Sequence, residues 1–343
     1  MPEPSHPPHA EPPGSDDAPG RRVPARSGAP GLRGLAADIG GSFIKFAPVG
    51  LDGALGEASR VSTPSTDWDG FCRALHSLCA PFAEDLALSL SIAGIVDAET
   101  GVALSANVSC TSGRRLAASL EEALGRRVLV ANDADCFALA EARGRGAARG
   151  VVFGIILGSG VGGGLVLDGR IVEGAGGIAG EWGHGPILGP IRLGGRDLGP
   201  LPCGCGQIGC LDTLGSARGL ERIDRHLHGE GRTSPVIVEH WRAGEASAAR
   251  AVEAWSDIMS GPLAVLVNAT GAVLVPVGGG LSNSAPLIAH LDAAVRRRLL
   301  RRTAGPLVVP ARLGEAAGLL GAAIRLEAFG AGSLPPADRE PPP

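Results

Sequence analysis

The sequence lacks the features that mark membrane and nucleic-acid-binding proteins. It has no run approaching the roughly 18 apolar residues of a membrane span, and its Pro- and His-bearing N-terminus lacks the apolar core of a signal peptide. Aromatic residues make up only 3%, and no basic run is interleaved with them. The 31 Lys and Arg against 35 Asp and Glu give a net charge of −4. We therefore expect a cytoplasmic protein whose partners are neither membranes nor nucleic acids.

The seven cysteines are not spaced as a disulfide framework. Three of them crowd into CGCGQIGC, which indicates a metal site rather than disulfide pairing. The other four are scattered among apolar residues, where a buried free thiol is the simpler interpretation. These four are Cys72, Cys79, Cys110 and Cys136.

At 343 residues the chain exceeds what one hydrophobic core usually supports, so we expect two core domains with a cleft between them. Residues 1–32 hold nine of the 27 prolines, and residues 331–343 are similar, so both segments are predicted to be disordered tails. Between them we expect a small N-terminal α/β domain over 33–131 and a large one over 132–313. A C-terminal helix over 314–330 should join the small domain.

Short β-rich apolar runs alternate with amphipathic stretches from residue 35 onward, which predicts an α/β protein. The predicted strands are LAADI, FIKFAPV, LALSLSI, RRVLVAND, VVFGIIL, GLVLDG and AVLVPVGGG. The predicted helices cover residues 67–82, 115–125, 133–147, 213–228, 247–268, 285–302 and 314–329.

Two segments, DIGGSFIKFAPVGLDG and LGSGVGGGLVLDGR, both read strand, glycine turn, strand and Leu-Asp-Gly turn, so the two halves look like diverged copies of one unit. A glycine turn bares backbone N–H groups that can surround phosphate oxygens. Each turn alone could be an ordinary hairpin, but two turns accompanied by an acidic residue favour phosphate and Mg²⁺ binding. The candidates are Asp38, Gly40, Gly41 and Ser42 in the first turn, and Gly158, Ser159, Gly160, Gly162 and Gly163 in the second.

Two aspartates, Asp38 and Asp133, stand at the ends of predicted strands, where a carboxylate could act on a bound ligand. Asp38 ends an apolar strand, where its carboxylate could hold a water of Mg²⁺ or could bond its own turn. Asn132 and Asp133 follow the strand VLVA and open a helix, where one acidic residue could serve as a cap. Since α/β folds place ligands at the carboxyl ends of strands, Asp133 is our candidate general base for transfer of phosphate to a sugar hydroxyl.

The segment GEWGH is followed by the cysteine cluster, and together they supply one imidazole and three thiolates. His184, Cys203, Cys205 and Cys210 form a Cys₃His set, the closed tetrahedral form typical of structural zinc. A zinc-ribbon nucleic-acid module is the rival, but it would want a second cysteine pair and basic neighbours. Glu181 could bind sugar hydroxyls or remain a solvated loop charge.

These motifs resemble the ROK family of bacterial sugar kinases and repressors over nearly all of residues 35–327. The resemblance lies in VLVANDADCFALAEA, in GIILGSGVGGGLVLDGRIVEGAGGIAGEWGH and in CGCGQIGCLDTLGS, in that order. The run VLVPVGGGLSN resembles the family's adenosine-side turn and adds Gly278, Gly279 and Gly280 to the ATP site. The resemblance implies a two-domain actin-like ATPase (ribonuclease H-like) fold with an interdomain cleft, ATP with Mg²⁺ as cofactor, one structural Zn²⁺ in the loop 181–212, and a homodimer.

Within the family, ALSANVSCTSGRRL and the FALAEA helix are most similar to bacterial N-acetyl-D-glucosamine kinases. The resemblance implies ATP-dependent phosphorylation of that sugar at its 6-hydroxyl, with Asp133 as the base. The implied sugar contacts are Asn107, Asn132, Asp133, Glu181, His184 and Asp212. His184 would serve both the metal and the sugar, because its two ring nitrogens can act separately.

Two departures from the family pattern bear on function. Phe43 replaces the usual lysine after the first turn, which removes a positive charge near the phosphates, and Asp212 stands where glutamate is usual.

The alternative functions are a glucokinase, fructokinase or N-acetylmannosamine kinase of the same family, or a non-catalytic sugar-binding or regulatory ROK protein. Regulators carry a winged helix-turn-helix before the first turn, whereas here a Pro-rich segment precedes Leu35.

Overall fold

The computed structural model describes residues 31–147, 149–229 and 231–330. The two predicted tails, 1–32 and 331–343, lie outside these residues except for Gly31 and Leu32, and Leu32 already begins the first strand. No helix in the described part of the chain has the length and apolar character needed to cross a membrane.

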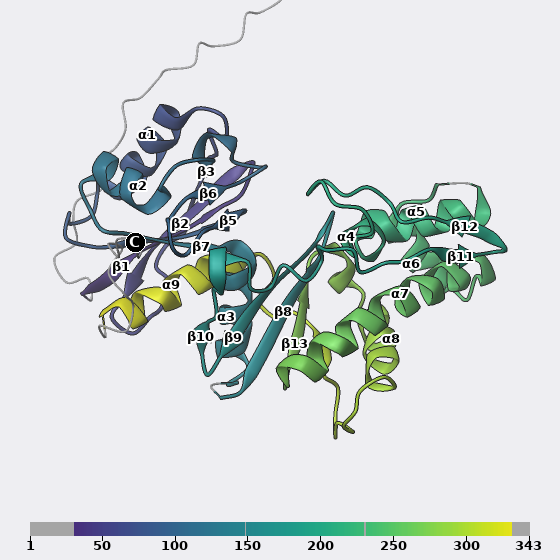
Figure 1. Cartoon of the computed structure of the whole chain (residues 1–343). Helices are drawn as coiled ribbons and strands as arrows, with labels where there is room; N and C mark the ends of the chain where they lie inside the picture. The colour runs from purple at the N-terminus through teal and green to yellow at the C-terminus, as the bar shows by residue number, and fades with distance from the viewer. Residues whose placement is uncertain (1–30, 148, 230, 331–343) are drawn as a thin grey trace, which may run out of the picture. The chain divides into compact units, whose positions relative to one another are not determined.

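The first sheet has the strand order β3-β2-β1-β4-β7, with β1, β2 and β3 antiparallel and β1, β4 and β7 parallel (Figure 1). Its strands are β1 (Leu32–Ile39), β2 (Phe43–Gly50), β3 (Ser59–Ser62), β4 (Leu88–Ile92) and β7 (Val128–Asn132). The helices α1 (Trp68–Cys79) and α2 (Leu116–Leu124) bury apolar residues of every fourth position against one face. The C-terminal helix α9 (Ala317–Gly330) packs against the other face.

The second sheet repeats this topology with the order β10-β9-β8-β13-β14. Its strands are β8 (Val151–Leu157), β9 (Val161–Leu167), β10 (Arg170–Ile171), β13 (Val275–Gly278) and β14 (Val308–Pro310). Three strands are again antiparallel, and β8, β13 and β14 are parallel. Helix α3 (Asp133–Gly144) packs on one side, and α5 (Ala217–His228), α7 (Ala246–Thr270) and α8 (Ala285–Arg296) pack on the other. The shared order agrees with the repeat in the sequence.

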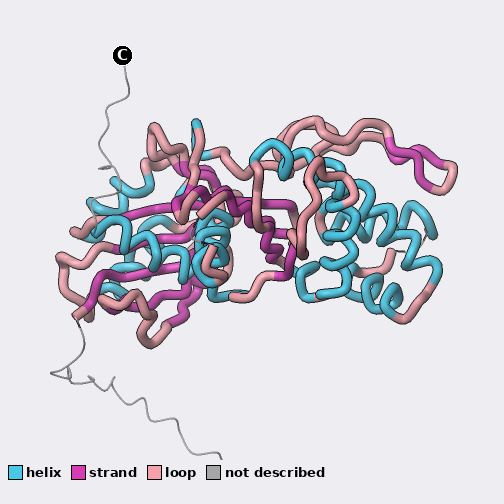
Figure 2. The backbone as a smooth tube through the Cα atoms, turned by 90° about the horizontal axis from the view of Figure 1, so that it is seen from below, coloured by secondary structure: helices cyan, strands magenta, loops and turns pink. Residues whose placement is uncertain are grey.

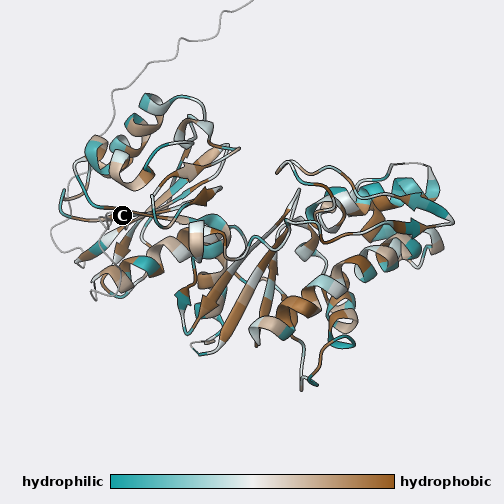
Figure 3. Ribbon diagram, in the orientation of Figure 1, coloured by the Kyte–Doolittle hydropathy of each residue, from teal (hydrophilic) through white to brown (hydrophobic). Residues whose placement is uncertain are grey.

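The larger hydrophobic core lies between the second sheet and α5, α7 and α8. Trp255 of α7 is fully buried there, and its indole N–H donates to the carbonyl of Gly215 at 2.9 Å. Figure 3 shows hydrophobic residues concentrated along β8 and β9, and Figure 2 shows helices flanking the strands.

The predicted helices differ from the observed ones at three points. The segment 213–228 is split at Ser216, which is extended and caps α5 by accepting from the Gly219 N–H, so α4 (Asp212–Gly215) is separate. The helix predicted over 285–302 ends at Arg296, whose guanidinium donates to the hydroxyl and the carbonyl of Thr303. Helix α6 (Ser234–Arg242) was not predicted.

Several short elements complete the described chain. They are β5 (Ile95–Val96), β6 (Ala103–Leu104), β11 (Ile191–Leu193), β12 (Arg196–Leu198), and the 3₁₀ turns at Ser109–Thr111, Ala175–Gly177, Gly280–Asn283 and Gly314–Ala316.

The segment between β14 and α9 is fastened to α3 by a buried carboxylate. Glu141 is fully buried, and its Oε1 accepts the backbone N–H groups of Arg312 and Leu313, both at 2.8 Å. Its Oε2 accepts from Arg145 Nε at 3.0 Å. This carboxylate therefore satisfies donors from two separate parts of the chain.

Replacement of Glu141 by Ala should lower the free energy of unfolding by about 3 kcal/mol, because two backbone N–H groups and one guanidinium lose their buried acceptor. A urea titration followed by circular dichroism would measure the change. The matched control is Glu122→Ala, an exposed position on α2, which should change stability by less than about 0.5 kcal/mol. Equal stability of the two variants would contradict this account.

Candidate active site and metal cluster

Asn132 and Asp133 have different roles at the start of α3. Asn132 is the cap: its Oδ1 accepts from the N–H groups of Ala134 at 2.7 Å and Asp135 at 3.3 Å. Its Nδ2 donates to the carbonyl of Gly94 at 2.9 Å. Because Asn132 satisfies the first turn of the helix, Asp133 is not required as the cap. Its carboxylate also accepts the Ala134 N–H at 3.0 Å.

Both Asp133 and Asp38 have raised pKa values. Burial, and next the negative charge of Asp38, raise the pKa of Asp133 to about 6. Burial also raises the pKa of Asp38, against the opposing effects of a hydrogen bond from Ser91 Oγ at 2.7 Å and of Lys45. Asp38 and Ser91 face each other in the pairing of β1 with β4, and Asn132 ends the next strand, β7. The two acids therefore lie at the carboxyl ends of parallel strands, the usual ligand position in α/β folds.

The first glycine turn connects β1 to β2. The Gly40 N–H donates to the carbonyl of Phe43 at 3.0 Å, and the Thr63 hydroxyl donates to the carbonyl of Gly40 at 2.7 Å. A Cβ at Gly41 would lie 3.2 Å from the carbonyl oxygen of Asn107. The turn is thus brought against Asn107, one of the residues implied to bind sugar. Asn107 itself is exposed on the loop after β6.

The second glycine turn connects β8 to β9 and is held by Asp212 and by the first residue of α5. The Gly158 N–H donates to Gly160 at 3.0 Å, and the Ala217 N–H donates to the carbonyl of Gly158 at 2.8 Å. Asp212 Oδ1 accepts the Val161 N–H at 2.7 Å. Asp212, predicted to contact sugar, therefore uses one carboxylate oxygen to fix the end of this turn.

The glycines of β9 have different surroundings. A Cβ at Gly162 would meet only an ordinary contact with Ile156 at 3.9 Å, so its side is open. A Cβ at Gly163 would lie 2.9 Å from both the carbonyl of Gly180 and the ring of Trp182. Gly163 thus permits close packing of the GEWGH segment, whereas Gly162 leaves space beside the strand.

The third glycine segment, Gly278 to Gly280, borders the second turn. Gly279 has φ +82°, and a Cβ there would lie 2.5 Å from the carbonyl of Leu157. At Gly278 a Cβ would collide with the ring of Phe137 at 2.8 Å, whereas Gly280 has open space. Two of the three sequence-predicted ATP segments are therefore adjacent.

The four predicted metal ligands come together. The donor atoms of His184, Cys203, Cys205 and Cys210 all lie within 4.8 Å of one another. His184 Nδ1 is 3.6 Å from Cys203 Sγ, and Cys205 Sγ is 3.6 Å from Cys210 Sγ. A tetrahedron with Zn–S bonds of about 2.3 Å has S···S edges of about 3.8 Å. The size and chemistry of this donor set fit a zinc ion.

The other edge of His184 faces Glu181. His184 Nε2 lies 3.8 Å from Glu181 Oε2, on the side of the ring opposite to Cys203. Asp212 Oδ2 is 3.9 Å from Cys203 Sγ. The imidazole can therefore bind a metal through Nδ1 while Nε2 is directed toward an acidic residue.

Two residues that bond to predicted site residues, Ser91 and Trp182, were not themselves predicted to take part. Ser91, which bonds Asp38, is fully buried in β4. The alternation of serine and apolar residues in LALSLSI is the signal that places Ser89 and Ser91 on one face of the strand. The Trp182 indole donates to the carbonyl of Gly162 at 3.0 Å, although its partner lies in another motif.

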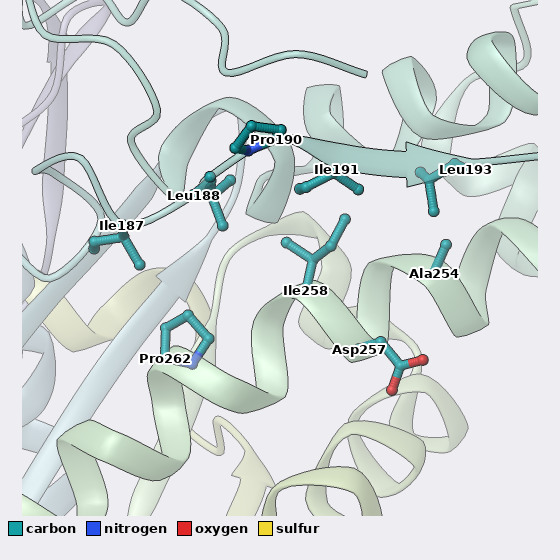
Figure 4. A pocket seen from close by; sticks show the side chains of 10 residues that line it. Ile187, Leu188, Pro190, Ile191, Leu193, Ala254, Asp257, Ile258 and Pro262 are labelled. Atoms are coloured by element: carbon teal, nitrogen blue, oxygen red, sulfur yellow. The ribbon is translucent and has the colours of Figure 1, made fainter. Parts of the chain in front are cut away.

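A separate pocket lies between the segment 187–193 and α7 (Figure 4). Its volume is about 370 Å³, and its lining is mainly apolar, including Ile187, Ile191 and Ile258. None of the predicted site residues lines it.

Comparison with known proteins places this chain in a family. The chain matches the ROK family over residues 34–328. It is 35% identical over 295 residues to an N-acetyl-D-glucosamine kinase of Pectobacterium atrosepticum, covering 84% of this chain and 96% of the relative. The corresponding kinase of Vibrio cholerae is 36% identical, with 84% and 97% covered.

Solved structures of ROK proteins are similar to this chain in fold. A ROK hexokinase from Thermus thermophilus has a TM-score of 0.71 and 31% identity, covering 87% of this chain and 99% of that one. A ROK glucokinase from Streptomyces griseus, in complex with glucose and AMPPNP, has a TM-score of 0.64 and 29% identity, covering 85% and 98%. The predicted α/β fold of the actin-like ATPase type is confirmed. The chain belongs to the ROK family.

Proposed function

We propose that this protein transfers the γ-phosphate of ATP to the 6-hydroxyl of a hexose, and that N-acetyl-D-glucosamine is its preferred sugar. The observation that carries the proposal is the proximity of Asp133 and Asp38 at the carboxyl ends of β7 and β1, in a chain 35–36% identical to N-acetyl-D-glucosamine kinases. Glucose is the second candidate, because the glucokinase described above is 29% identical.

In this reaction Asp133 orients the sugar hydroxyl and takes its proton as the hydroxyl oxygen attacks the γ-phosphorus. The bond between that phosphorus and the bridging oxygen breaks, and ADP leaves. A pKa of about 6 keeps Asp133 mostly ionised at pH 7 and still basic enough to accept the proton. Mg²⁺, when bound with ATP, neutralises phosphate charge, and Asp38 is the carboxylate that would hold it.

The remaining site residues are proposed to bind the two substrates. The sugar would meet Asn107, beside the first turn, and Glu181 and His184 near the metal cluster. Asn132 and Asp212 have part of their polar groups occupied by the N–H groups of Ala134 and Val161, so their first role is to hold Asp133 and the second turn in position. The three glycine segments would surround the nucleotide, with the open side of Gly162 toward it.

A panel of N-acetylglucosamine, glucose, N-acetylmannosamine and fructose would test the function with purified protein and ATP. We expect N-acetylglucosamine to have the highest kcat/KM in a coupled assay for ADP. A higher kcat/KM for another sugar would overturn the substrate assignment, whereas the absence of sugar-dependent ADP formation would remove the kinase function itself.

Replacement of Asp133 by Asn should lower kcat by about 10² or more, because the amide keeps the size but cannot take the proton. The wild-type kcat/KM should rise with pH to a plateau with an apparent pKa of about 6, since only the ionised carboxylate is active. The residual activity of the variant should lack this rise. Near-normal turnover in the variant would leave Asp133 with a structural role alone.

We also propose that His184, Cys203, Cys205 and Cys210 hold one structural zinc. The segment that carries them has few regular elements, with the short strands β11 and β12 between His184 and Cys203. Bound metal would supply the order that this segment cannot obtain from a hydrophobic core. Because Glu181 and His184 belong to the same segment, the sugar site would depend on the metal.

Cys205→Ser should reduce zinc from about one ion per chain toward none. It should also weaken sugar binding by about tenfold or more, because the segment that carries Glu181 and His184 loses the metal that orders it. Elemental analysis and calorimetric titration with N-acetylglucosamine on the same sample would measure both. The control is Cys72→Ser, a partly buried thiol outside the cluster, which should keep its zinc. Full sugar affinity in a zinc-free variant would show that the metal is incidental to function.

A further inference from the structure

A row of polar residues crosses one face of the first sheet, starting beside Asp133. Asp38 of β1 pairs with Ser91 of β4 on one side and with Lys45 of β2 on the other, and Lys45 pairs with Arg60 of β3. Residues directly opposite each other on neighbouring strands share a face of the sheet. The row therefore runs from Asp38 outward to Arg60 on the edge strand.

The two cations of this row differ in their partners. Lys45 is the single lysine of the sequence, and its Nζ donates to the backbone carbonyl of Glu315 at 2.9 Å and pairs with Glu315 Oε2 at 3.1 Å. The guanidinium of Arg60 stacks on Phe43 and has neither a hydrogen bond nor an ion pair with any residue in the described part of the chain. The hydrogen bond and charge of Lys45, and to a lesser extent the charge of Arg60, lower the pKa of Glu315. Lys45 is thus bound directly by the segment before α9, whereas the N–H groups of the Arg60 guanidinium have no direct partner there.

An aromatic ring holds Arg60 next to the first glycine turn. Its guanidinium carbon lies 3.6 Å from the centroid of the Phe43 ring. Phe43 follows Gly40, Gly41 and Ser42 directly, and 41% of its surface is exposed. Stacking on the ring is a favourable cation–π contact that leaves the N–H edge of the guanidinium free. The available cation is therefore positioned at the entrance of β2, where the turn ends.

We propose that Arg60, positioned by Phe43, binds the β- or γ-phosphate of ATP at the first glycine turn. This inference rests on the proposed kinase function. The turn offers backbone N–H groups but no formal positive charge, and the residue after it is apolar. A guanidinium supplies both charge and a planar pair of donors that match phosphate oxygens. Arg60 thus replaces, from the neighbouring strand, the charge that Phe43 does not provide.

The test compares ligands that differ only in their phosphates, using calorimetric titration with Mg·AMPPNP and with adenosine. Arg60→Gln should raise the Kd for Mg·AMPPNP by about tenfold, the loss expected for one charge-assisted hydrogen bond, and leave the Kd for adenosine unchanged. The difference from wild type should shrink at high ionic strength. Phe43→Leu should weaken Mg·AMPPNP binding in the same direction, because Arg60 loses the ring that positions it.

The chain offers a matched control in Arg114, whose guanidinium carbon stacks on Trp68 at 4.3 Å. Arg114→Gln should leave the Kd for Mg·AMPPNP unchanged. An unchanged Kd in Arg60→Gln would overturn the inference while leaving the kinase function intact. An equal loss of adenosine binding would also overturn it, since Arg60 would then act through folding. If wild type bound no Mg·AMPPNP, both the inference and the proposed function would fail.

Discussion

The position of α3 is the constraint on which the candidate site depends, and it is set by close packing against glycines of four other elements. A Cβ at Gly164 of β9 would lie 2.5 Å from the carbonyl of Ala134, and one at Gly154 of β8 would lie 2.7 Å from Ala138. A Cβ at Gly278 of β13 would lie 2.8 Å from the ring of Phe137, and one at Gly321 of α9 would lie closer still to the carbonyl oxygen of Cys136. A larger side chain at any of these glycines would push α3, and Asp133 with it, out of place.

This packing explains why the glycine-rich motifs were only partly interpretable from sequence. Most of the strands, the repeat and the turns follow from local patterns of apolar residues and glycine, and these were predicted. The edge strands β3 and β14 were not predicted, because they are short and carry no long apolar run. The reason for each glycine is a different matter, because Gly163 and Gly164 accommodate Trp182 and Ala134, which belong to other motifs. A sequence motif records that a side chain is excluded, but it does not record whether a ligand or the protein's own backbone fills the space.

The same limit applies to the polar residues. His184 and the cysteine cluster were proposed as a metal site because three cysteines lie within eight residues, CGCGQIGC, and metal chemistry restricts the types of its ligands. The division between Asn132 as cap and Asp133 as a carboxylate with a raised pKa depends on burial and on Asp38, nearly a hundred residues earlier. Likewise, Arg60 has no motif of its own, and its relation to Phe43 arises only when β2 and β3 pair.

The metal cluster and the second glycine turn read as separate motifs in the sequence, yet they form one connected structure. The Trp182 indole bonds the carbonyl of Gly162, and Asp212 bonds the Val161 N–H while its other oxygen lies 3.9 Å from Cys203 Sγ. Each of these residues is within two positions of a proposed ligand. Order in the proposed metal loop would therefore be transmitted to the strand that is proposed to face the nucleotide, as well as to Glu181. A zinc that is structural in its coordination would thus help to set the distance between sugar and ATP, the quantity on which phosphoryl transfer depends.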